Sequence, residues 1–384
     1  MVSTLNLKKV ILSVVFIIIF YSPIFFSYAE SYPLIRVAII QDITSVTIKV
    51  KGFYEIKDPK TDRLLIRDRD LKTTALTDKK RILLGNINFN LERLLIKPDD
   101  KEAIFINGRN FRGSIELIIN HYGRLLVVNH IELEDYIKGI LYHEVSHYWP
   151  QEALKAQAIA CRSFALYKRE ENKLQDFDVT CDVYSQIYGG RTSERLRTNR
   201  AVEETKGMVL TYNGRLLPAY YHATCGGKTE DASLVWNIDI FPLKGINCNF
   251  CKESPHFKWH AVLSLNEIRK KLNQAGYNIK EIVDISVLQR SSSGRINNLA
   301  ILTKEEKKEI LAKDLRIILG PDIIKSTNFN FKIINRDVVF EGRGWGHGVG
   351  MCQWGAYFMA KQGYSFLEIL RYYYPGTDVQ TIRF

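Results

Sequence analysis

The sequence has no tandem repeat, no low-complexity tract long enough to act as a linker, and no alternating series of strands and helices. These absences argue against a repeat architecture, a flexible tether between domains, and a parallel α/β sheet, respectively. The basic residues are not gathered into blocks either, although the formal net charge is +12. An ordinary basic surface therefore explains the charge as well as an anionic partner does.

The 384 residues are 46% hydrophobic and 11% aromatic, which is enough for a buried core in one large domain or two. Residues 34–50 and 104–128 have the alternating pattern of β-strands, whereas residues 57–83 are charged and rich in turn formers. From residue 131 the pattern mixes helices and strands. We predict an α+β fold with a β-rich core, divided into residues 1–29, a β-rich part at 30–130 and a second part at 131–384.

The N-terminal residues have the composition of an export signal. Lys8 and Lys9 precede an apolar run at 10–26, and Ser27-Tyr28-Ala29 then offers small residues at the spacing that signal peptidase uses. We predict a cleaved signal peptide at 1–29, with an uncleaved N-terminal anchor as the alternative. The protein is therefore expected outside the cytoplasm, in the periplasm or cell envelope, where nucleic acid is not an expected partner.

Two helices and a hairpin can be placed from local signals. A helix capped by Glu134 and Asp135 should run through Leu141, and a second should begin at Pro150, whose missing N–H costs nothing in a first turn. The second helix carries a stripe of apolar, mostly small residues that lets another element approach closely, namely Leu154, Ala158, Cys161 and Ala165. Strands are expected at 208–212 and 217–222 around an Asn-Gly turn, and a helix at 265–274.

The string His143-Glu144-Val145-Ser146-His147 matches the zinc-protease pattern. On a helix, two histidines four residues apart can bind one metal, and the glutamate between them can polarise the metal-bound water. Pro150, however, should end the helix close to His147 and leave that ligand on a fraying turn. A zinc metalloprotease is therefore only a remote alternative.

Two long motifs far apart in the chain resemble those of the stage II sporulation protein D (SpoIID/LytB) family. The first comprises Tyr136-Ile137-Lys138-Gly139-Ile140, Glu144, and the run from Trp149-Pro150-Gln151-Glu152-Ala153 through Arg162-Ser163-Phe164-Ala165. The second is Gly342-Arg343-Gly344-Trp345-Gly346-His347-Gly348-Val349-Gly350-Met351-Cys352-Gln353-Trp354. Weaker matches lie between them, including Ser185-Gln186-Ile187-Tyr188-Gly189 and Gly226-Gly227-Lys228-Thr229-Glu230.

The resemblance implies a protein that acts on peptidoglycan, with residues 131–384 as a SpoIID-like catalytic core around a glycan-binding groove. Members of the family include lytic transglycosylases that cut glycan strands stripped of stem peptides, and enhancers of N-acetylmuramoyl-L-alanine amidases. The family's catalytic glutamate maps onto Glu144. The partners implied are glycan strands and a cell-wall amidase or membrane-associated wall-remodelling complex.

One carboxyl group is sufficient for this chemistry. A carboxylic acid with a raised pKa can protonate the departing glycosidic oxygen, and as a carboxylate it can then take the proton from the C6 hydroxyl that closes on C1. The product is a 1,6-anhydro sugar, and no water has to be activated, in contrast to the two-carboxylate hydrolases. We therefore assign Glu144 as acid and then base, with no cofactor required for the chemistry.

Several polar and aromatic residues in the matched motifs are candidates for substrate contact. Trp149 could line the groove, and the alternating glycines at 344–350 let the backbone approach a sugar chain. Their spacing does not fit the dinucleotide fingerprint. His347 could equally be a satisfied core histidine. The predicted substrate-binding set is Trp149, Arg162, Gln186, Lys228, Arg343, His347 and Gln353.

A metal site is more plausible away from the protease-like string. His222 and Cys225, and then Cys248 and Cys251, form two pairs of ligand residues with two residues between the members of each pair. Four such ligands could hold a structural zinc ion. Disulfide bonds are the competing interpretation for an exported chain. The other cysteines, Cys161, Cys181 and Cys352, are expected to be buried thiols.

Overall fold

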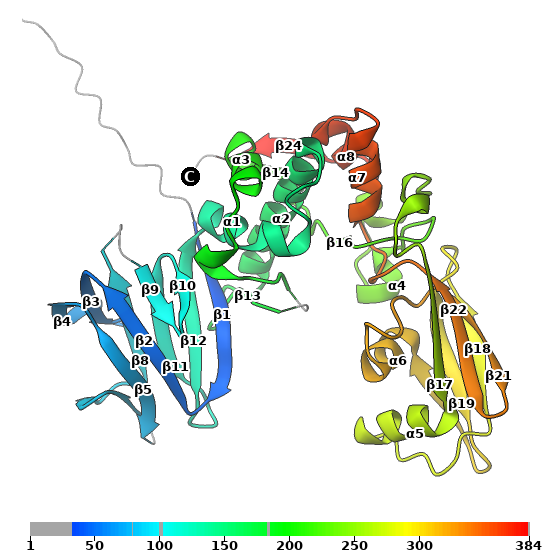
Figure 1. Ribbon diagram of the computed structural model, residues 1–384, viewed down its shortest axis with the longest axis horizontal. Coiled ribbons are helices and arrows are strands. Elements are labelled where there is room, and N and C mark those ends of the chain that lie inside the picture. The colour runs from blue at the N-terminus through cyan, green and yellow to red at the C-terminus, as the bar shows by residue number, and fades with distance from the viewer. Residues whose placement is uncertain (1–32, 79, 100–102, 183–184, 383–384) are drawn as a thin grey trace, which may run out of the picture. The chain divides into compact units, whose positions relative to one another are not determined.

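The computed structural model describes residues 33–78, 80–99, 103–182 and 185–382 (Figure 1). The chain forms helices and several separate β-sheets, which confirms the α+β class. The predicted signal peptide or anchor at 1–29 lies outside the described residues. None of the helices in the described ranges is long and apolar enough to span a membrane.

Two large sheets are formed by the N-terminal strands. The seven-stranded sheet has the order β13-β1-β12-β11-β8-β3-β4 and the six-stranded sheet the order β10-β9-β2-β5-β6-β7. The first contains β1 (Leu34–Ile43), β3 (Phe53–Asp58), β4 (Arg63–Arg69), β8 (Arg93–Pro98), β11 (Ser114–Ile119), β12 (Leu125–Glu132) and β13 (Val179–Thr180). The second contains β2 (Ser45–Lys51), β5 (Lys72–Asp78), β6 (Arg81–Leu84), β7 (Ile87–Phe89), β9 (Ala103–Ile106) and β10 (Arg109–Phe111).

The two sheets share one hydrophobic core. In β2 the side chains alternate between solvent and core, and Val46, Ile48 and Val50 are each 1% exposed. Residues 57–83 were wrongly predicted to be turn-rich, since they form strands β4, β5 and most of β6. The same alternation explains the error. In β5 only Ala75 is fully buried, so the polar residues that suggested turns occupy the outer face of a strand.

Helix α1 (Leu133–Glu144) follows directly on β12, and α2 (Gln151–Glu171) begins immediately after Pro150, as predicted. The predicted stripe of α2 is fully buried in the same core as the sheets, and Ala156, Ile159 and Ala160 on its other side pack into a second core. Helix α2 is thus buried on two faces, which accounts for its many small side chains.

The second core gathers short elements from the middle and the end of the chain. They are β14 (Met208–Tyr212), β16 (Tyr221–His222), α4 (Ala232–Trp236), η2 (Phe241–Leu243), η3 (Phe250–Glu253), β23 (Met351–Cys352), α7 (Gln353–Lys361), α8 (Phe366–Tyr373) and β24 (Asp378–Thr381). Three other short elements pack against the first core instead, namely η1 (Gly190–Ser193), α3 (Leu196–Glu204) and β15 (Arg215–Leu216). Asn213 and Gly214 both have positive φ, of 50° and 73°, which confirms the hairpin turn. The strand expected at 217–222 is shorter, since only β16 forms there.

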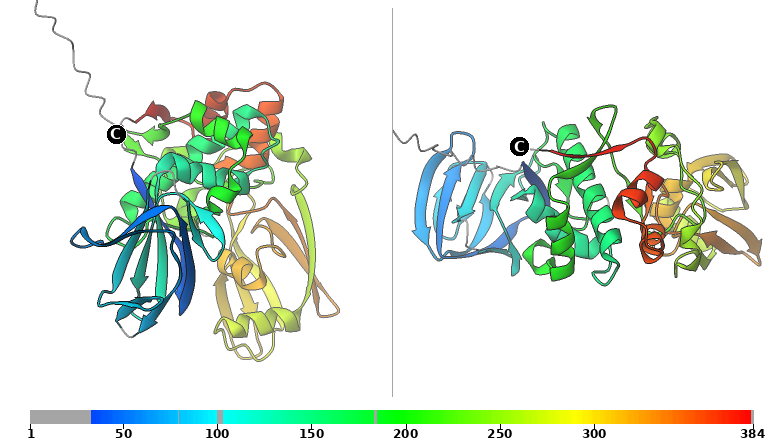
Figure 2. Two further views of the ribbon diagram at one scale, coloured as in Figure 1. Left: turned by 60° about the vertical axis from the view of Figure 1, so that its left-hand side comes forward. Right: turned by 90° about the horizontal axis from the view of Figure 1, so that it is seen from above.

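A third core lies between residues 258 and 343. Its elements are β17 (Lys258–Ser264), α5 (Leu265–Gln274), β18 (Asp284–Arg290), β19 (Ile296–Leu302), β20 (Lys307–Leu311), α6 (Ala312–Leu319), β21 (Phe329–Ile334) and β22 (Asp337–Arg343). They form two three-stranded sheets, β17-β22-β21 and β18-β19-β20. Figure 2 shows these segments, coloured yellow-green to orange, grouped together. Helix α5 has the predicted bounds.

Candidate functional site

Glu144 is the last residue of α1, and the chain leaves the helix at Val145 in extended conformation, with φ −144° and ψ 152°. The helix therefore extends three residues beyond Leu141 and ends three residues before His147, close to where Pro150 was predicted to end it. His143 forms a 2.6 Å hydrogen bond with the hydroxyl of Ser193, and neither histidine joins a group of three metal-ligating side chains in the described ranges. The geometry gives no support for the zinc-protease alternative.

The loop that follows residue 184 packs closely against α1 because of two glycines. Gly189 donates its N–H to the carbonyl of Gly139 at 3.1 Å. A Cβ at Gly139 would lie 2.5 Å from the ring of Tyr188, so any larger residue there would push the loop away. This contact directs the backbone N–H of Ile187 at Oε1 of Glu144, 3.2 Å away.

A buried chain of hydrogen bonds leads to the Glu144 carboxyl from the other side. Tyr136 donates its hydroxyl proton to Oε1 of Gln186 at 3.0 Å, and Nε2 of Gln186 donates to the hydroxyl oxygen of Tyr221 at 3.0 Å. That oxygen also accepts from Sγ of Cys161 at 3.5 Å. With both donors on the oxygen, the hydroxyl proton of Tyr221 is available for its hydrogen bond to the Glu144 carboxyl.

The environment of Glu144 is suited to proton transfer near neutral pH. Burial raises the pKa of its carboxyl to about 7, and the hydrogen bonds from Ile187, Tyr221 and Gln353 act in the opposite direction by stabilising the charged form. The residue as a whole is partly exposed. A carboxyl with this pKa can act first as a general acid and then as a general base.

Helix α7 is joined to the end of α1 by Gln353. Its Nε2 donates to the backbone carbonyl of Glu144 at 3.2 Å, and the residue is 7% exposed. Gln353 was predicted as a substrate contact, but the structure shows it holding the backbone of Glu144. The next residue, Trp354, packs with its ring centroid 5.2 Å from that of Trp149.

Trp149 and Trp354 belong to a series of neighbouring, partly exposed rings that we call the aromatic row. Tyr357 lies 5.1 Å from Trp149, and His256 lies 6.4 Å from Trp354 and 4.5 Å from Trp345, measured between ring centroids. The amine of Lys325 sits 5.0 Å from the centroid of Trp345. The row thus connects the segment after Glu144 with the glycine-rich loop.

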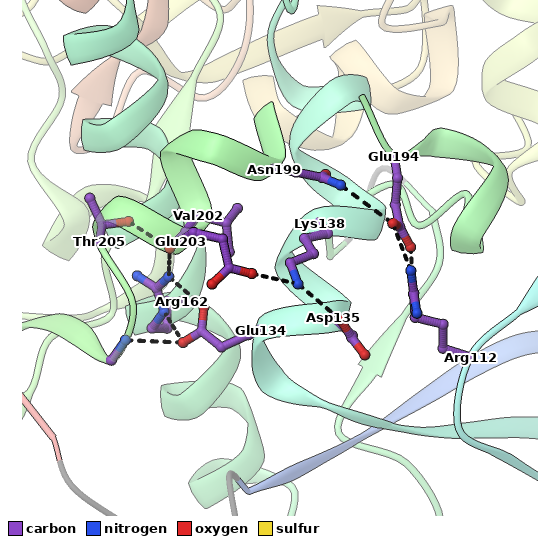
Figure 3. Close-up of polar contacts among 11 residues, drawn as sticks. Arg112, Glu134, Asp135, Lys138, Arg162, Glu194, Asn199, Val202, Glu203 and Thr205 are labelled. Atoms are coloured by element: carbon purple, nitrogen blue, oxygen red, sulfur yellow. Dashed lines mark hydrogen bonds and ion pairs between the residues drawn. The ribbon is translucent and has the colours of Figure 1, made fainter. Parts of the chain in front are cut away.

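The prediction that Arg162 binds substrate is wrong. Its side chain is fully buried, and its Nε and Nη2 donate to the two carboxylate oxygens of Glu134 at 2.9 and 2.8 Å (Figure 3). Nη1 donates to the carbonyl of Met208 at 2.9 Å. Because these donors are all hydrogen-bonded inside the protein, the guanidinium fixes α2 to the start of α1 and cannot reach a ligand. Gln186 is 1% exposed and likewise supports Tyr221 instead of facing substrate.

The other predicted substrate contacts lie near the surface and stay predictions. Lys228 donates from Nζ to the backbone carbonyl of Ser292 at 3.3 Å, and Arg343 is exposed at the end of β22. His347 is partly exposed, and its Nδ1 accepts the N–H of Val349 at 3.1 Å. Its ring lies 4.8 Å from that of Trp236.

The predicted metal ligands require one correction. The sulfurs of Cys225, Cys248 and Cys251 lie together with that of Cys352, all four within 4.8 Å of one another, and His222 is not in this group. The parallel pairing of β16 with β23 brings Cys352 beside His222, whose ring is directed to the Val349 carbonyl instead. Nδ1 of His222 is hydrogen-bonded to the Val349 carbonyl at 3.0 Å, whereas its buried Nε2 has no hydrogen-bond partner among the described residues.

Comparison with known proteins identifies the family. A family model described as Stage II sporulation protein matches residues 121–212, which include Glu144, and a domain of unknown function, DUF8618, matches residues 243–350. Stage II sporulation protein D of Bacillus subtilis (strain 168) is 31% identical over 267 residues, covering 66% of this chain and 75% of that protein. The chain belongs to the stage II sporulation protein D family.

Two further relatives of this SpoIID family member extend the similarity over most of the chain. An uncharacterized protein of Brachyspira hyodysenteriae is 33% identical over 349 residues, covering 90% of this chain and 92% of the relative. The amidase enhancer of Bacillus subtilis (strain 168) is 28% identical over 378 residues. That match covers 85% of this chain and 52% of the enhancer, so the chain spans about half of the enhancer's length. The resemblance seen in the sequence is confirmed.

Three contributors to these sites were missed by reasoning from the sequence. The N–H of Ile187 lies in a segment that was matched to the family, but a backbone donor has no signature of its own. Tyr221 precedes His222, which was singled out instead. Cys352 lies inside the second family motif, but it was expected to be a buried thiol because no second ligand residue lies near it at the spacing of the two predicted pairs.

Proposed function

We propose that this protein is a lytic transglycosylase that cleaves peptidoglycan glycan strands from which the stem peptides have been removed. The observation that carries the proposal is Glu144, a partly exposed residue at the end of α1 whose carboxyl has a pKa raised by burial to about 7. Its family membership and a relative named amidase enhancer support a cell-wall role. A cell-wall role supports a location outside the cytoplasm, and the predicted export signal is a second argument for it.

In the proposed reaction, protonated Glu144 gives its proton to the glycosidic oxygen that leaves C1 of N-acetylmuramic acid. The resulting carboxylate is stabilised by the Ile187 N–H, 3.2 Å away, and by Tyr221. It then takes the proton of the C6 hydroxyl as the C6 oxygen bonds to C1, which yields the 1,6-anhydro product and restores protonated Glu144. The proton count balances without an activated water.

The aromatic row is the proposed platform for the sugar rings. Tryptophan and tyrosine offer flat apolar faces with polar edges, which suits the alternating apolar and hydroxyl surfaces of a glycan. Trp149 is five residues after Glu144, and Trp354 follows the glutamine that holds Glu144 in place. Lys228, Arg343 and His347 remain proposed polar contacts to the strand.

The second candidate is a non-catalytic glycan-binding protein that stimulates an amidase. It is favoured by the similarity to the amidase enhancer, although that match covers only 52% of the enhancer. In this role the aromatic row would still bind glycan, and Glu144 would serve no proton transfer. The two candidates therefore differ in the product formed by the purified protein alone.

The decisive experiment is digestion of denuded glycan strands with the purified protein, followed by mass spectrometry of the sugars. We expect 1,6-anhydro products from the wild type, a decrease of ~10²–10⁴-fold in rate for Glu144→Gln, and unchanged glycan binding. Glu170→Gln, a change on the exposed end of α2, is the matched control and should keep full activity. Absence of any product from the wild type, together with stimulation of an added amidase, would establish the enhancer role instead.

A further inference from the structure

The four-cysteine cluster, formed by Cys225, Cys248, Cys251 and Cys352, has no part in the proposed chemistry. All four residues are buried, with 0% exposure, and their sulfurs lie within 4.8 Å of one another. They come from three segments of the chain, since Cys225 follows β16, Cys248 and Cys251 flank the start of η3, and Cys352 ends β23. Folding has therefore brought together thiols that are up to 127 residues apart.

The separation of the sulfurs fits one tetrahedral metal ion. With Zn–S bonds of about 2.3 Å, two ligands of a tetrahedron lie about 3.8 Å apart. The sulfurs of Cys225 and Cys251 are 3.3 Å apart, and no pair exceeds 4.8 Å. We propose that the four-cysteine cluster binds a single structural zinc ion, with Cys352 as the fourth ligand and His222 outside the coordination sphere.

Backbone donors surround the sulfurs as expected for thiolates. The N–H of Cys225 and the N–H of Gly355 both donate to Sγ of Cys352, each at 3.3 Å. The N–H of Gly227 donates to Sγ of Cys225 at 3.4 Å. Hydrogen bonds of this kind stabilise negative charge on sulfur and orient the ligands of a metal.

A buried guanidinium supplies the opposite charge. Four thiolates around one zinc ion carry a net negative charge, which is costly in a protein interior unless it is compensated. Arg295 is 1% exposed, and its Nη2 donates to the carbonyl of Cys225 at 2.6 Å. Its Nε is buried without a hydrogen-bond partner in the described part of the chain. Glu230, which is 3% exposed, is one source of negative charge beside this cation, and thiolates in the cluster would be a second.

The proposed zinc ion would also support Glu144 at a distance. Cys352 caps the first turn of α7 through the N–H of Gly355, and the adjacent Gln353 holds the backbone carbonyl of Glu144. A closed site with four protein ligands has no open position for substrate or water, so its role is structural. The inference rests on the geometry of the four-cysteine cluster and its surroundings, and it does not depend on the proposed glycan cleavage.

The test is the metal content of the purified full-length protein, measured by inductively coupled plasma mass spectrometry. We expect about one zinc ion per chain in the wild type, and a loss of about tenfold or more after Cys352→Ser. Cys161→Ser, a buried thiol outside the cluster, and His222→Ala should both keep their zinc. Zinc that persists in Cys352→Ser but is lost in His222→Ala would overturn the assigned ligand set.

A second measurement uses the unaltered protein, in case Cys352→Ser does not fold. Cobalt exchanged into the wild type should show the thiolate-to-metal charge transfer and ligand-field absorption of a tetrahedral sulfur site, unchanged in His222→Ala. The four thiols should also become reactive toward a thiol reagent only after a chelator is added. Peptide mapping that finds disulfide bonds among the four cysteines, or a purified protein that binds iron and no zinc, would contradict the proposal. None of these readouts depends on activity toward glycan.

Discussion

Glu144 shows how a single residue obtains its chemistry from groups that are distant in the sequence. Its raised pKa comes from burial, while the donors that stabilise its carboxylate come from the loop at Ile187 and from Tyr221. These two influences oppose each other. Their balance leaves a carboxyl that is partly protonated at neutral pH, which is the condition that the proposed acid-and-base role requires.

At the residue scale we predict that Tyr221→Phe shifts the pH profile of glycan cleavage. Loss of the hydroxyl removes a hydrogen bond to the carboxylate and so raises the pKa of Glu144, by about one unit, from its starting value of about 7. The protonated form then persists to higher pH, and the alkaline limb of the rate profile moves upward. The control is Tyr212→Phe on β14, and identical profiles for both variants would refute the role of Tyr221.

At the element scale, the site depends on the contact between α1 and the loop at 185–190. A Cβ on Gly189 would collide with the side chains of Ser193 and His143, and Gly139 has no room for one either. Both glycines therefore set the distance between Glu144 and the N–H of Ile187. The requirement is steric, since Gly189 has an ordinary φ of −98°.

We predict that Gly189→Ala destabilises the protein by about 1–3 kcal/mol and lowers glycan cleavage more than glycan binding. The displaced loop carries the N–H of Ile187 away from Glu144, which removes the stabilisation of the carboxylate. Thermal unfolding and the pH profile of the rate measure the two effects. Ile187→Ala is the matched control because it keeps the backbone N–H and changes a side chain that is 38% exposed. Equal loss of activity in both variants would contradict the argument.

At the scale of the whole molecule, Glu144 makes stability depend on pH. Its pKa is about 7 in the folded state and near 4.5 in the unfolded chain, so the folded state binds more protons between these values. The contribution of Glu144 to stability is therefore fully present below pH 4.5 and is lost as pH rises toward 7. The loss is on the order of 2 kcal/mol, less than the full shift implies because Glu144 is partly exposed.

We predict that Glu144→Gln abolishes this pH dependence. The difference in unfolding free energy between Glu144→Gln and the wild type should increase by on the order of 2 kcal/mol from pH 4.5 to pH 8. Urea denaturation at several pH values measures it, with Glu170→Gln as the control. Parallel stability curves for the wild type and Glu144→Gln would show that Glu144 has an ordinary pKa in the folded protein.

Much of the local structure could be predicted because it depends on neighbouring residues. Pro150 marks the start of α2, Asn213-Gly214 forms its turn, and α5 has its predicted bounds. The strands between residues 57 and 83 could not be predicted in this way. In β5, for example, only one side chain is buried, so its composition resembles that of a turn. Its β-structure comes from pairing with distant strands, which leaves no local signal.

The sequence by itself determined the α+β class, the family and the glutamate at its centre, because those depend on periodicity and on motifs of contiguous residues. Only the tertiary structure decided what surrounds that glutamate. In the folded protein Arg162 forms a buried ion pair with Glu134, and Tyr221 lies beside the Glu144 carboxyl. The fourth member of the cysteine cluster is Cys352, where the sequence had suggested His222. The physical reason is that burial and hydrogen bonding are set by contacts between distant segments. When several residues of the sequence could serve in a site, these contacts decide which of them does.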